Sequence, residues 1–222
     1  EPLNVDLSAV SSCGEARLAI ARFLCIESGR VELVRDSDNQ PLPASQHFGE
    51  DESVELALIL LPDPVEVAAE ANLLNVAQVS SFEDLLALDT LRCGFPNKLP
   101  VLPERLGDWT ELRLLDVSHG SLGKLPDGIG KLVGLLSLRL LNNALVALPE
   151  SIVGLTSLEE LWLDSNRLVG LPDSIGNLNH LQRLRLNYNS ITELPAAFGG
   201  LLSLQEFSIS SNELTFLPDS FG

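Results

Sequence analysis

Cysteine is scarce in this sequence, and long apolar runs are absent. The 222 residues include 3 Cys, with no Cys-x-x-Cys pair and no Asn-x-Ser/Thr glycosylation site. An odd number of cysteines argues against an extracellular disulfide framework, so we expect an intracellular location in a reducing compartment. The cytoplasm is the first choice, and an organelle reached after removal of a targeting sequence is the alternative. No run of 18 apolar residues occurs, so no membrane-spanning helix and no direct membrane insertion is expected.

Basic side chains are also few. Lys and Arg number 14 against 31 Asp and Glu, which gives a formal net charge of -17. Such a charge repels phosphate backbones and anionic lipid headgroups. We therefore expect no nucleic-acid partner.

The motifs of common catalytic sites are missing. The sequence has no Gly-x-Ser-x-Gly, no Walker A, no Gly-x-Gly-x-x-Gly and no His-Glu-x-x-His. Its histidines, His47, His119 and His180, are predicted to lie in a loop and on two different faces. We therefore predict no catalytic residues, no cofactor and no metal site.

What the chain does have is a repeat of 23 residues. The dipeptide Leu-Pro begins at Leu102, Leu125, Leu148, Leu171, Leu194 and Leu217. A second column, also 23 apart, consists of Asn143, Asn166, Asn189 and Asn212. A fixed period of about 20–50 residues indicates a stack of similar coils.

Each column of the repeat has a physical interpretation. The pattern L-x-x-L-x-L predicts a short strand whose leucines point inward. The asparagine is predicted to satisfy backbone groups of its own coil and the adjacent coil where the chain turns. Gly120 replaces it in the first full repeat, so a looser turn is expected there. The proline suits the first position of a short helical or 3-10 turn, followed by the buried column Ile129, Ile152, Ile175 and Phe198.

The pattern resembles the leucine-rich repeat, of the 23-residue type found in intracellular Ras-associated scaffolds and their plant counterparts. The resemblance covers residues 99–222 and implies an α/β solenoid. A parallel sheet would line its concave face, with short helical or 3-10 turns on the convex face. We expect this array to be cut, or to continue, after Gly222.

Residues 1–62 do not repeat. Alternating apolar residues predict strands at 31–35 and 55–61, and the order of elements resembles the ubiquitin-like β-grasp, incomplete at its N-terminus. Pro62-Asp63-Pro64 stands where a covalent modifier has a diglycine tail, so the resemblance implies a docking domain at most. A generic α+β domain is the alternative.

Residues 63–98 are predicted to be a helical linker and N-terminal cap. A helix over 65–79 would place Val67, Ala71, Leu74 and Ala77 near one face. Ser80 and Glu83 have the spacing of a capping box at the start of a second helix. A degenerate first repeat begins at Leu88, and one inserted residue brings it into register.

The concave face carries the candidate binding residues. In one outward column Trp162 lies between Arg139 and Arg185, and aromatic and arginine side chains are enriched at interface hot spots. The alternative is that Trp162 only shields the sheet. The predicted partner-binding set is Asp116, Arg139, Leu141, Trp162, Asp164, Arg183, Arg185 and Tyr188.

These observations favour a non-enzymatic protein-interaction scaffold. By fold resemblance its partner could be a small GTPase, a phosphatase or a multi-subunit complex. Two alternatives stay open. The chain could be a peripheral structural subunit of a large membrane or organelle complex, or the recognition half of a longer enzyme such as a ubiquitin ligase.

Overall fold

The computed structural model describes residues 31–35, 56–60, 64–78, 81–93 and 99–221, and the chain divides into two compact units, 1–64 and 65–222. In the first unit, strands β1 (Val31–Arg35) and β2 (Leu56–Leu60) pair antiparallel. Both strands lie where the alternating pattern predicts them. The rest of the ubiquitin-like prediction falls outside the described residues and stays a prediction.

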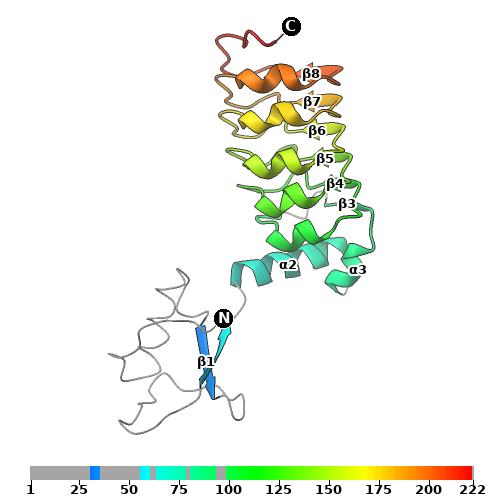
Figure 1. Cartoon of the computed structure of the whole chain (residues 1–222), viewed down its shortest axis with the longest axis vertical. Coiled ribbons are helices and arrows are strands. Elements are labelled where there is room, and N and C mark those ends of the chain that lie inside the picture. Colours follow the sequence, from blue (N-terminus) through cyan, green and yellow to red (C-terminus); the bar gives the residue numbers. More distant parts are fainter. Residues whose placement is uncertain (1–30, 36–55, 61–63, 79–80, 94–98, 222) are drawn as a thin grey trace, which may run out of the picture. The chain divides into compact units, whose positions relative to one another are not determined.

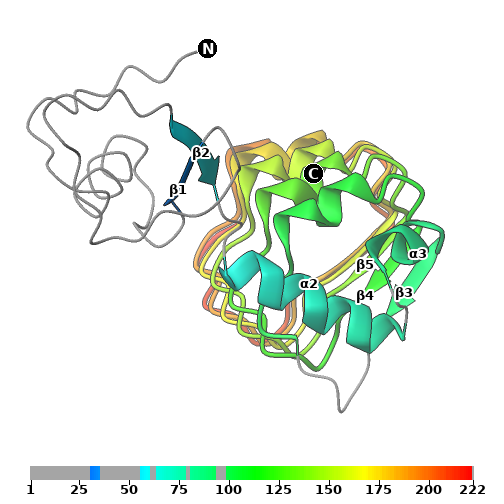
Figure 2. The same ribbon diagram turned by 90° about the horizontal axis from the view of Figure 1, so that it is seen from below.

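The second unit starts with two helices, α2 (Pro64–Ala77) and α3 (Phe82–Leu86), which lie beside the β3 end of the repeats (Figures 1 and 2). The N-cap of α3 is Ser81, whose Oγ accepts a hydrogen bond of 3.1 Å from the Asp84 backbone N–H. The capping pair is thus one residue later than the predicted Ser80 and Glu83. The sequence is ambiguous here because both adjacent serines have an acidic residue three positions on.

The predicted buried face of α2 is confirmed in part. Leu74 and Ala77 pack against the core as predicted, whereas Val67 and Ala71 are exposed, and Ala69 and Leu73 are buried. Apolar residues surround this helix, so their spacing alone does not select a face. Leu73 is buried because it joins Leu85 of α3 in the core of the repeats.

Six parallel strands form one sheet in chain order, with each strand beside the next (Figure 1). Along most of the sheet, residues 23 apart face each other, as Leu115, Leu138 and Leu161 do. Between the first two strands Leu91 faces Leu115, 24 positions on, which confirms the predicted insertion. The strands are β3 (Thr90–Arg92), β4 (Leu114–Asp116), β5 (Ser137–Arg139), β6 (Glu160–Trp162), β7 (Arg183–Arg185) and β8 (Glu206–Ser208).

A column of 3-10 helices runs along the other side of the coils (Figure 1). A proline precedes each helix in extended conformation, for example Pro149 at φ -70° and ψ 151°. The proline is therefore the N-cap because its ψ is not helical, and the prediction that it is the first helical residue is wrong. The helices are η2 (Glu104–Asp108), η3 (Asp127–Lys131), η4 (Glu150–Gly154), η5 (Asp173–Asn177) and η6 (Ala196–Gly200).

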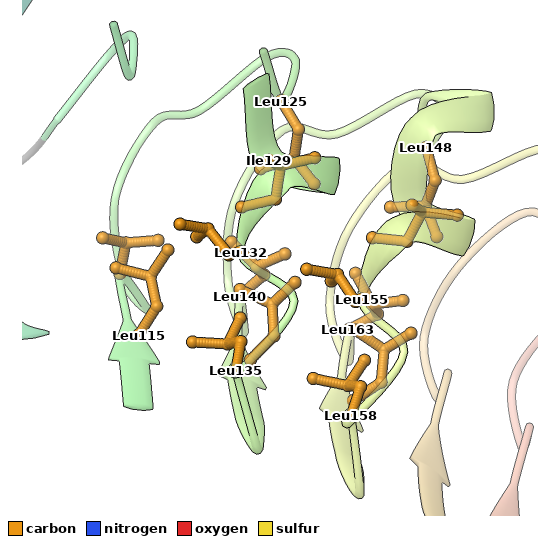
Figure 3. Close-up of a cluster of buried hydrophobic side chains, with 14 of the residues drawn as sticks. Leu115, Leu125, Ile129, Leu132, Leu135, Leu140, Leu148, Leu155, Leu158 and Leu163 are labelled. Atoms are coloured by element: carbon orange, nitrogen blue, oxygen red, sulfur yellow. The ribbon is translucent and has the colours of Figure 1, made fainter. Parts of the chain in front are cut away.

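The core lies between the strands and the 3-10 helices (Figure 3). Leu138 and Leu140 of one coil are fully buried, and so is Ile152 of the η4 helix. Figure 3 shows equivalent side chains, such as Leu140 and Leu163, in matching positions in successive coils. Burial of one such side chain contributes about 1.5–3 kcal/mol, so the solenoid is held by repetition of one small core.

The asparagine column forms a ladder of buried hydrogen bonds. Asn166 donates from Nδ2 to the carbonyls of Leu140 (2.9 Å) and Leu163 (3.0 Å), and its Oδ1 accepts from the Leu145 N–H (3.1 Å). Asn143 and Asn189 repeat this pattern. One amide thus joins two coils where the backbone turns, as predicted.

The turn at Gly120 lacks that amide. The Ser121 N–H lies 3.5 Å from the Leu99 carbonyl, whereas the equivalent bond from Ala144 to Leu122 in the next coil is 2.8 Å. The longer bond agrees with the predicted looser turn.

Glycines allow neighbouring 3-10 helices to approach closely. A Cβ added at Gly176 would lie 2.0 Å from the Ala197 carbonyl oxygen, and one at Gly154 would lie 2.0 Å from the Gly130 oxygen. Gly170, on another side of the coil, has no atom within 4 Å of such a Cβ. The helical side therefore has no room for a methyl group, although neither glycine has positive φ.

We expect Gly176→Ala to destabilise the chain by about 1–3 kcal/mol, because backbone has to move to admit the methyl group. Gly170→Ala, the matched control, should be neutral or stabilise by about 0.4–1 kcal/mol through the unfolded chain. Urea unfolding of the two variants measures the difference. Equal stability of both would show that the close packing of the 3-10 helices is unimportant.

Candidate protein-interaction surface

The outward side chains of the sheet form columns because parallel strands in register place equivalent residues side by side. Arg139 on β5 faces Trp162 on β6, which faces Arg185 on β7. The guanidinium carbon lies 4.1 Å from the Trp162 ring centre in Arg139 and 4.9 Å in Arg185. Each contact is within cation–π range, where it contributes about 0.5–2 kcal/mol. The structure therefore brings these three candidate residues into one stack.

Glu160 holds two of the candidate arginines. Its Oε2 accepts a hydrogen bond of 3.1 Å from Arg139 Nη2, and its Oε1 accepts one of 3.0 Å from Arg183 Nε and a second from Arg183 Nη2. Ser137 Oγ donates to Oε2 at 3.0 Å and accepts from Arg139 Nε at 3.3 Å. The Glu160 side chain is 16% exposed, so these bonds are shielded from water.

The charge of Glu160 is stabilised by these neighbours. Burial raises the pKa of its carboxyl, but hydrogen bonds from Arg183, Ser137 and Arg139 outweigh burial, and the pKa is lowered below the ordinary glutamate value. The bond to Glu160 in turn raises the pKa of Arg183. An ionised Glu160 thus keeps Arg139 in place against Trp162.

Arg185 is different from the other two arginines. Its side chain is exposed, and within the described part of the chain it makes no ion pair. Its guanidinium lies over the Trp162 ring.

The candidate aspartates accept hydrogen bonds near the ends of their strands, Asp116 from its own coil and Asp164 from the next coil. Asp116 Oδ1 accepts from the Ser118 N–H at 3.1 Å. Asp164 Oδ1 accepts from the Asn187 N–H at 3.0 Å and from Asn187 Nδ2 at 2.6 Å. These bonds order the ends of the strands, so the two aspartates are held as parts of the scaffold around the stack.

Leu141 is half-buried on the concave side, and Tyr188 is 65% exposed at the turn after β7. Tyr188 has φ 57°, in the left-handed region. A bulky side chain rarely adopts this conformation, and Asn adopts it more readily. The equivalent residues with positive φ are His119, Asn142, Ser165 and Ser211.

The indole N–H of Trp162 is buried and lacks a hydrogen-bond partner among the described residues. The ring as a whole is half-buried. An unsatisfied buried donor costs about 1–3 kcal/mol. Trp162 therefore carries a hydrogen-bond donor that this surface itself does not use.

Sequence reasoning missed the roles of Glu160 and Ser137. The signal was present, because Ser137, Glu160 and Arg183 are spaced 23 apart and therefore lie side by side on adjacent strands.

Within the described residues, no group of three or more His, Cys, Asp or Glu could hold a metal ion. None of the helices described is long and apolar enough to cross a membrane.

Comparison with protein families agrees with this geometry. Residues 67–187 match the model of a leucine-rich repeat region, and residues 180–201 and 203–222 match the single leucine-rich repeat model. The chain belongs to the leucine-rich repeat family. A search among curated proteins gave no match.

Several solved structures resemble part of the chain. One is the ectodomain of the Arabidopsis thaliana receptor kinase GASSHO1/SCHENGEN3 in complex with CASPARIAN STRIP INTEGRITY FACTOR 2, with 35% identity and TM-score 0.55 over 61% of this chain. The PEPR1–AtPEP1 structure has 29% identity and TM-score 0.55 over 60%, and the TDR receptor has 32% identity and TM-score 0.52 over 56%. The matches cover 17%, 19% and 22% of those chains respectively, so this leucine-rich repeat array corresponds to a small part of each.

Glu160→Gln should weaken the dependence of stability on acid pH. Because the pKa of Glu160 is lower in the folded chain, its carboxylate stabilises the fold above the ordinary glutamate pKa, and this contribution is lost as the pH falls through the folded value. As the pH falls below the ordinary glutamate pKa, the wild type should therefore lose more unfolding free energy than the variant.

Urea unfolding at several pH values measures this loss. Glu150→Gln, which removes an exposed carboxylate elsewhere, controls for the loss of one negative charge. A Glu160→Gln curve parallel to that of the wild type would contradict the prediction.

Proposed function

We propose that this leucine-rich repeat solenoid is a scaffold that binds a protein partner through its concave face, centred on Trp162. The observation that carries the proposal is the stack of Trp162 between two arginines on the outer side of the sheet. Tryptophan and arginine side chains at the centre of a surface are the types that dominate binding energy in protein interfaces.

The ion-pair network supports the same proposal because it fixes the stack before a partner arrives. Glu160 and Ser137 hold Arg139, whose side chain is 24% exposed, and Arg139 supports one face of Trp162. A side chain that is already ordered loses little rotamer freedom on binding, so more of its contact energy contributes to affinity.

Tyr188 gives a second line of support. It is a large aromatic side chain held exposed in a strained backbone conformation at the end of β7. The left-handed conformation belongs to the repeat turn, since His119, Asn142, Ser165 and Ser211 share it, but a bulky side chain suits it poorly. A stabilising residue such as the Asn142 of an earlier coil is absent here, which fits a role for the ring in binding.

We further propose that α2 and α3 cap the first coils. Leu73 and Leu85 join the core, and Glu66 Oε2 accepts from the Glu104 N–H at the start of η2 (2.8 Å). Trp109 Nε1 donates to the Leu88 carbonyl at 2.5 Å. The apolar end of a solenoid needs such a cover, and this would leave the sheet as the free surface.

Related solenoids also support a polypeptide-binding role. The GASSHO1/SCHENGEN3 ectodomain and PEPR1 were both solved with a second named molecule, CASPARIAN STRIP INTEGRITY FACTOR 2 and AtPEP1. A small GTPase, a phosphatase or a subunit of a larger complex remains the proposed kind of partner for this chain.

Site-specific photo-crosslinking tests the face. A benzophenone amino acid at Tyr188 should crosslink to the partner, whereas the same group at His180, exposed away from the strands, should not. With the crosslinked protein identified and purified, Trp162→Ala should lower its affinity by about 2 kcal/mol or more. Crosslinks from His180 alone, or unchanged affinity in a folded Trp162→Ala variant, would refute the concave face as the binding surface.

Tyr188→Asn should raise stability while lowering affinity for the same partner. Asn suits the left-handed backbone, so a gain of about 0.5–1 kcal/mol in unfolding free energy is expected. Tyr188→Phe keeps the ring and the strain, and should change stability little. Thermal unfolding and a binding titration of both variants measure the two effects. Normal binding by Tyr188→Asn would show that Tyr188 is not part of the binding site.

A further inference from the structure

A hollow of about 610 Å³ lies beside the 3-10 helices η5 and η6, near the β8 end of the solenoid (Figure 1). It is bordered by Asp173 of η5, by residues 193–196 at the start of η6 and by residues 216–220 of the last coil. Its volume is in the range of about 300–1,000 Å³ that is usual for ligand-binding clefts. We infer that this hollow is a second docking surface, and that its occupant is a polypeptide segment with a Lys or Arg next to an apolar residue.

A short side chain in an otherwise acidic column helps to open the hollow. Ala196 is the first residue of η6, and it lies between Asp173 and Asp219 in its column, 23 positions from each. All three residues line the hollow. The other 3-10 helices begin with an acidic residue, namely Glu104, Asp127, Glu150 and Asp173.

The charged side chains that line the hollow have one sign. They are Asp173, Glu193 and Asp219. Each is exposed, and within the described part of the chain none of them makes an ion pair. Residues 186–222 of the sequence contain no Lys, Arg or His. A basic side chain that entered the hollow would therefore meet carboxylates without a competing cation among the lining residues.

The cations that come before this stretch of sequence lie elsewhere. Arg185 belongs to the sheet, where arginines and carboxylates are mixed. Arg167 is in the column of Ser190 and Glu213, outside the lining of the hollow. The hollow thus differs from the concave face in having a single kind of charge.

Phe216 offers an apolar contact beside these carboxylates, and its side chain is 60% exposed. The residues equivalent to it in other coils include Lys124, Ala147 and Glu193, which are exposed as well. Its exposure therefore follows from an outward column. An aromatic face next to carboxylates suits a basic side chain, because the ring attracts the cation that the carboxylates neutralise.

A metal ion fits the hollow less well than a basic side chain does. In the part of the chain that the structure describes, no three His, Cys, Asp or Glu side chains are grouped closely enough to hold one. Carboxylates spread around an apolar hollow suit Lys and Arg, whose apolar stems pack on such a surface while the charged end reaches the rim.

Phage display of random dodecapeptides on the purified full chain tests the inference. One group of selected peptides should be rich in Lys or Arg next to apolar residues, and should bind Trp162→Ala as tightly as the wild type. Glu193→Gln combined with Asp219→Asn should bind these peptides roughly tenfold more weakly, because two exposed ion pairs are lost. Phe216→Ala should weaken binding roughly fivefold through loss of the ring.

Glu150→Gln combined with Glu213→Gln is the matched control. It removes two exposed carboxylates outside the hollow, so its net charge equals that of the other double variant. Its affinity for the peptides should stay within about twofold of the wild type, since salt screens charges more than about 8 Å away. Urea unfolding checks that all variants are folded, and every substituted side chain other than Trp162 is exposed.

Equal loss of affinity in the two double variants would show attraction to the net charge alone and would overturn the inference. Selected peptides without basic residues, basic peptides that need Trp162 instead of the hollow, or no selected peptides at all would overturn it too. The concave-face function does not depend on this result, because its own test uses Trp162 and Tyr188 with the crosslinked partner.

Discussion

The constant length of the coil is the constraint on which this structure depends. Because almost every coil contains 23 residues, parallel strand pairing about 4.8 Å apart places each residue beside its equivalent in the next coil. Each column of equivalent residues therefore stabilises the fold through one contact, made by a buried leucine, an amide or a glycine, that is repeated from coil to coil. A change of length shifts a whole coil, and the single extra residue between β3 and β4 is taken up before the regular array begins.

The same constraint creates the candidate site from ordinary parts. Three side chains in one column, Arg139, Trp162 and Arg185, become a stack solely because their strands are in register. In the neighbouring column, register also places Glu160 between Ser137 and Arg183. The same strand register thus builds both the core and the candidate surface. The inward residues are alike in every coil, whereas the outward residues differ from coil to coil.

The 23-residue spacing predicted which residues lie side by side on adjacent coils. It did not predict which of the long side chains bond to one another. The buried columns, the asparagine bonds and the sides of the coil follow from spacing, and so does the position of Trp162 between two arginines. That Glu160 holds Arg139 and Arg183 but not Arg185 depends on how long side chains bend, which spacing does not contain. The buried face of α2 was predicted only in part, for Leu74 and Ala77, because apolar residues lie on several sides of that helix and it lies outside the repeat.

The glycines of the 3-10 helices have a consequence for the opposite side of the molecule. Gly154 and Gly176 bring backbone of adjacent coils into direct contact, so backbone rather than side chains limits how closely the coils approach on this side. The relative spacing of back and front sets the curvature of a solenoid, so these glycines help to set the bend per coil. That bend decides how closely Arg139, Trp162 and Arg185 converge on the sheet. The shape of the surface offered to a partner thus depends in part on residues that no partner on that face can touch.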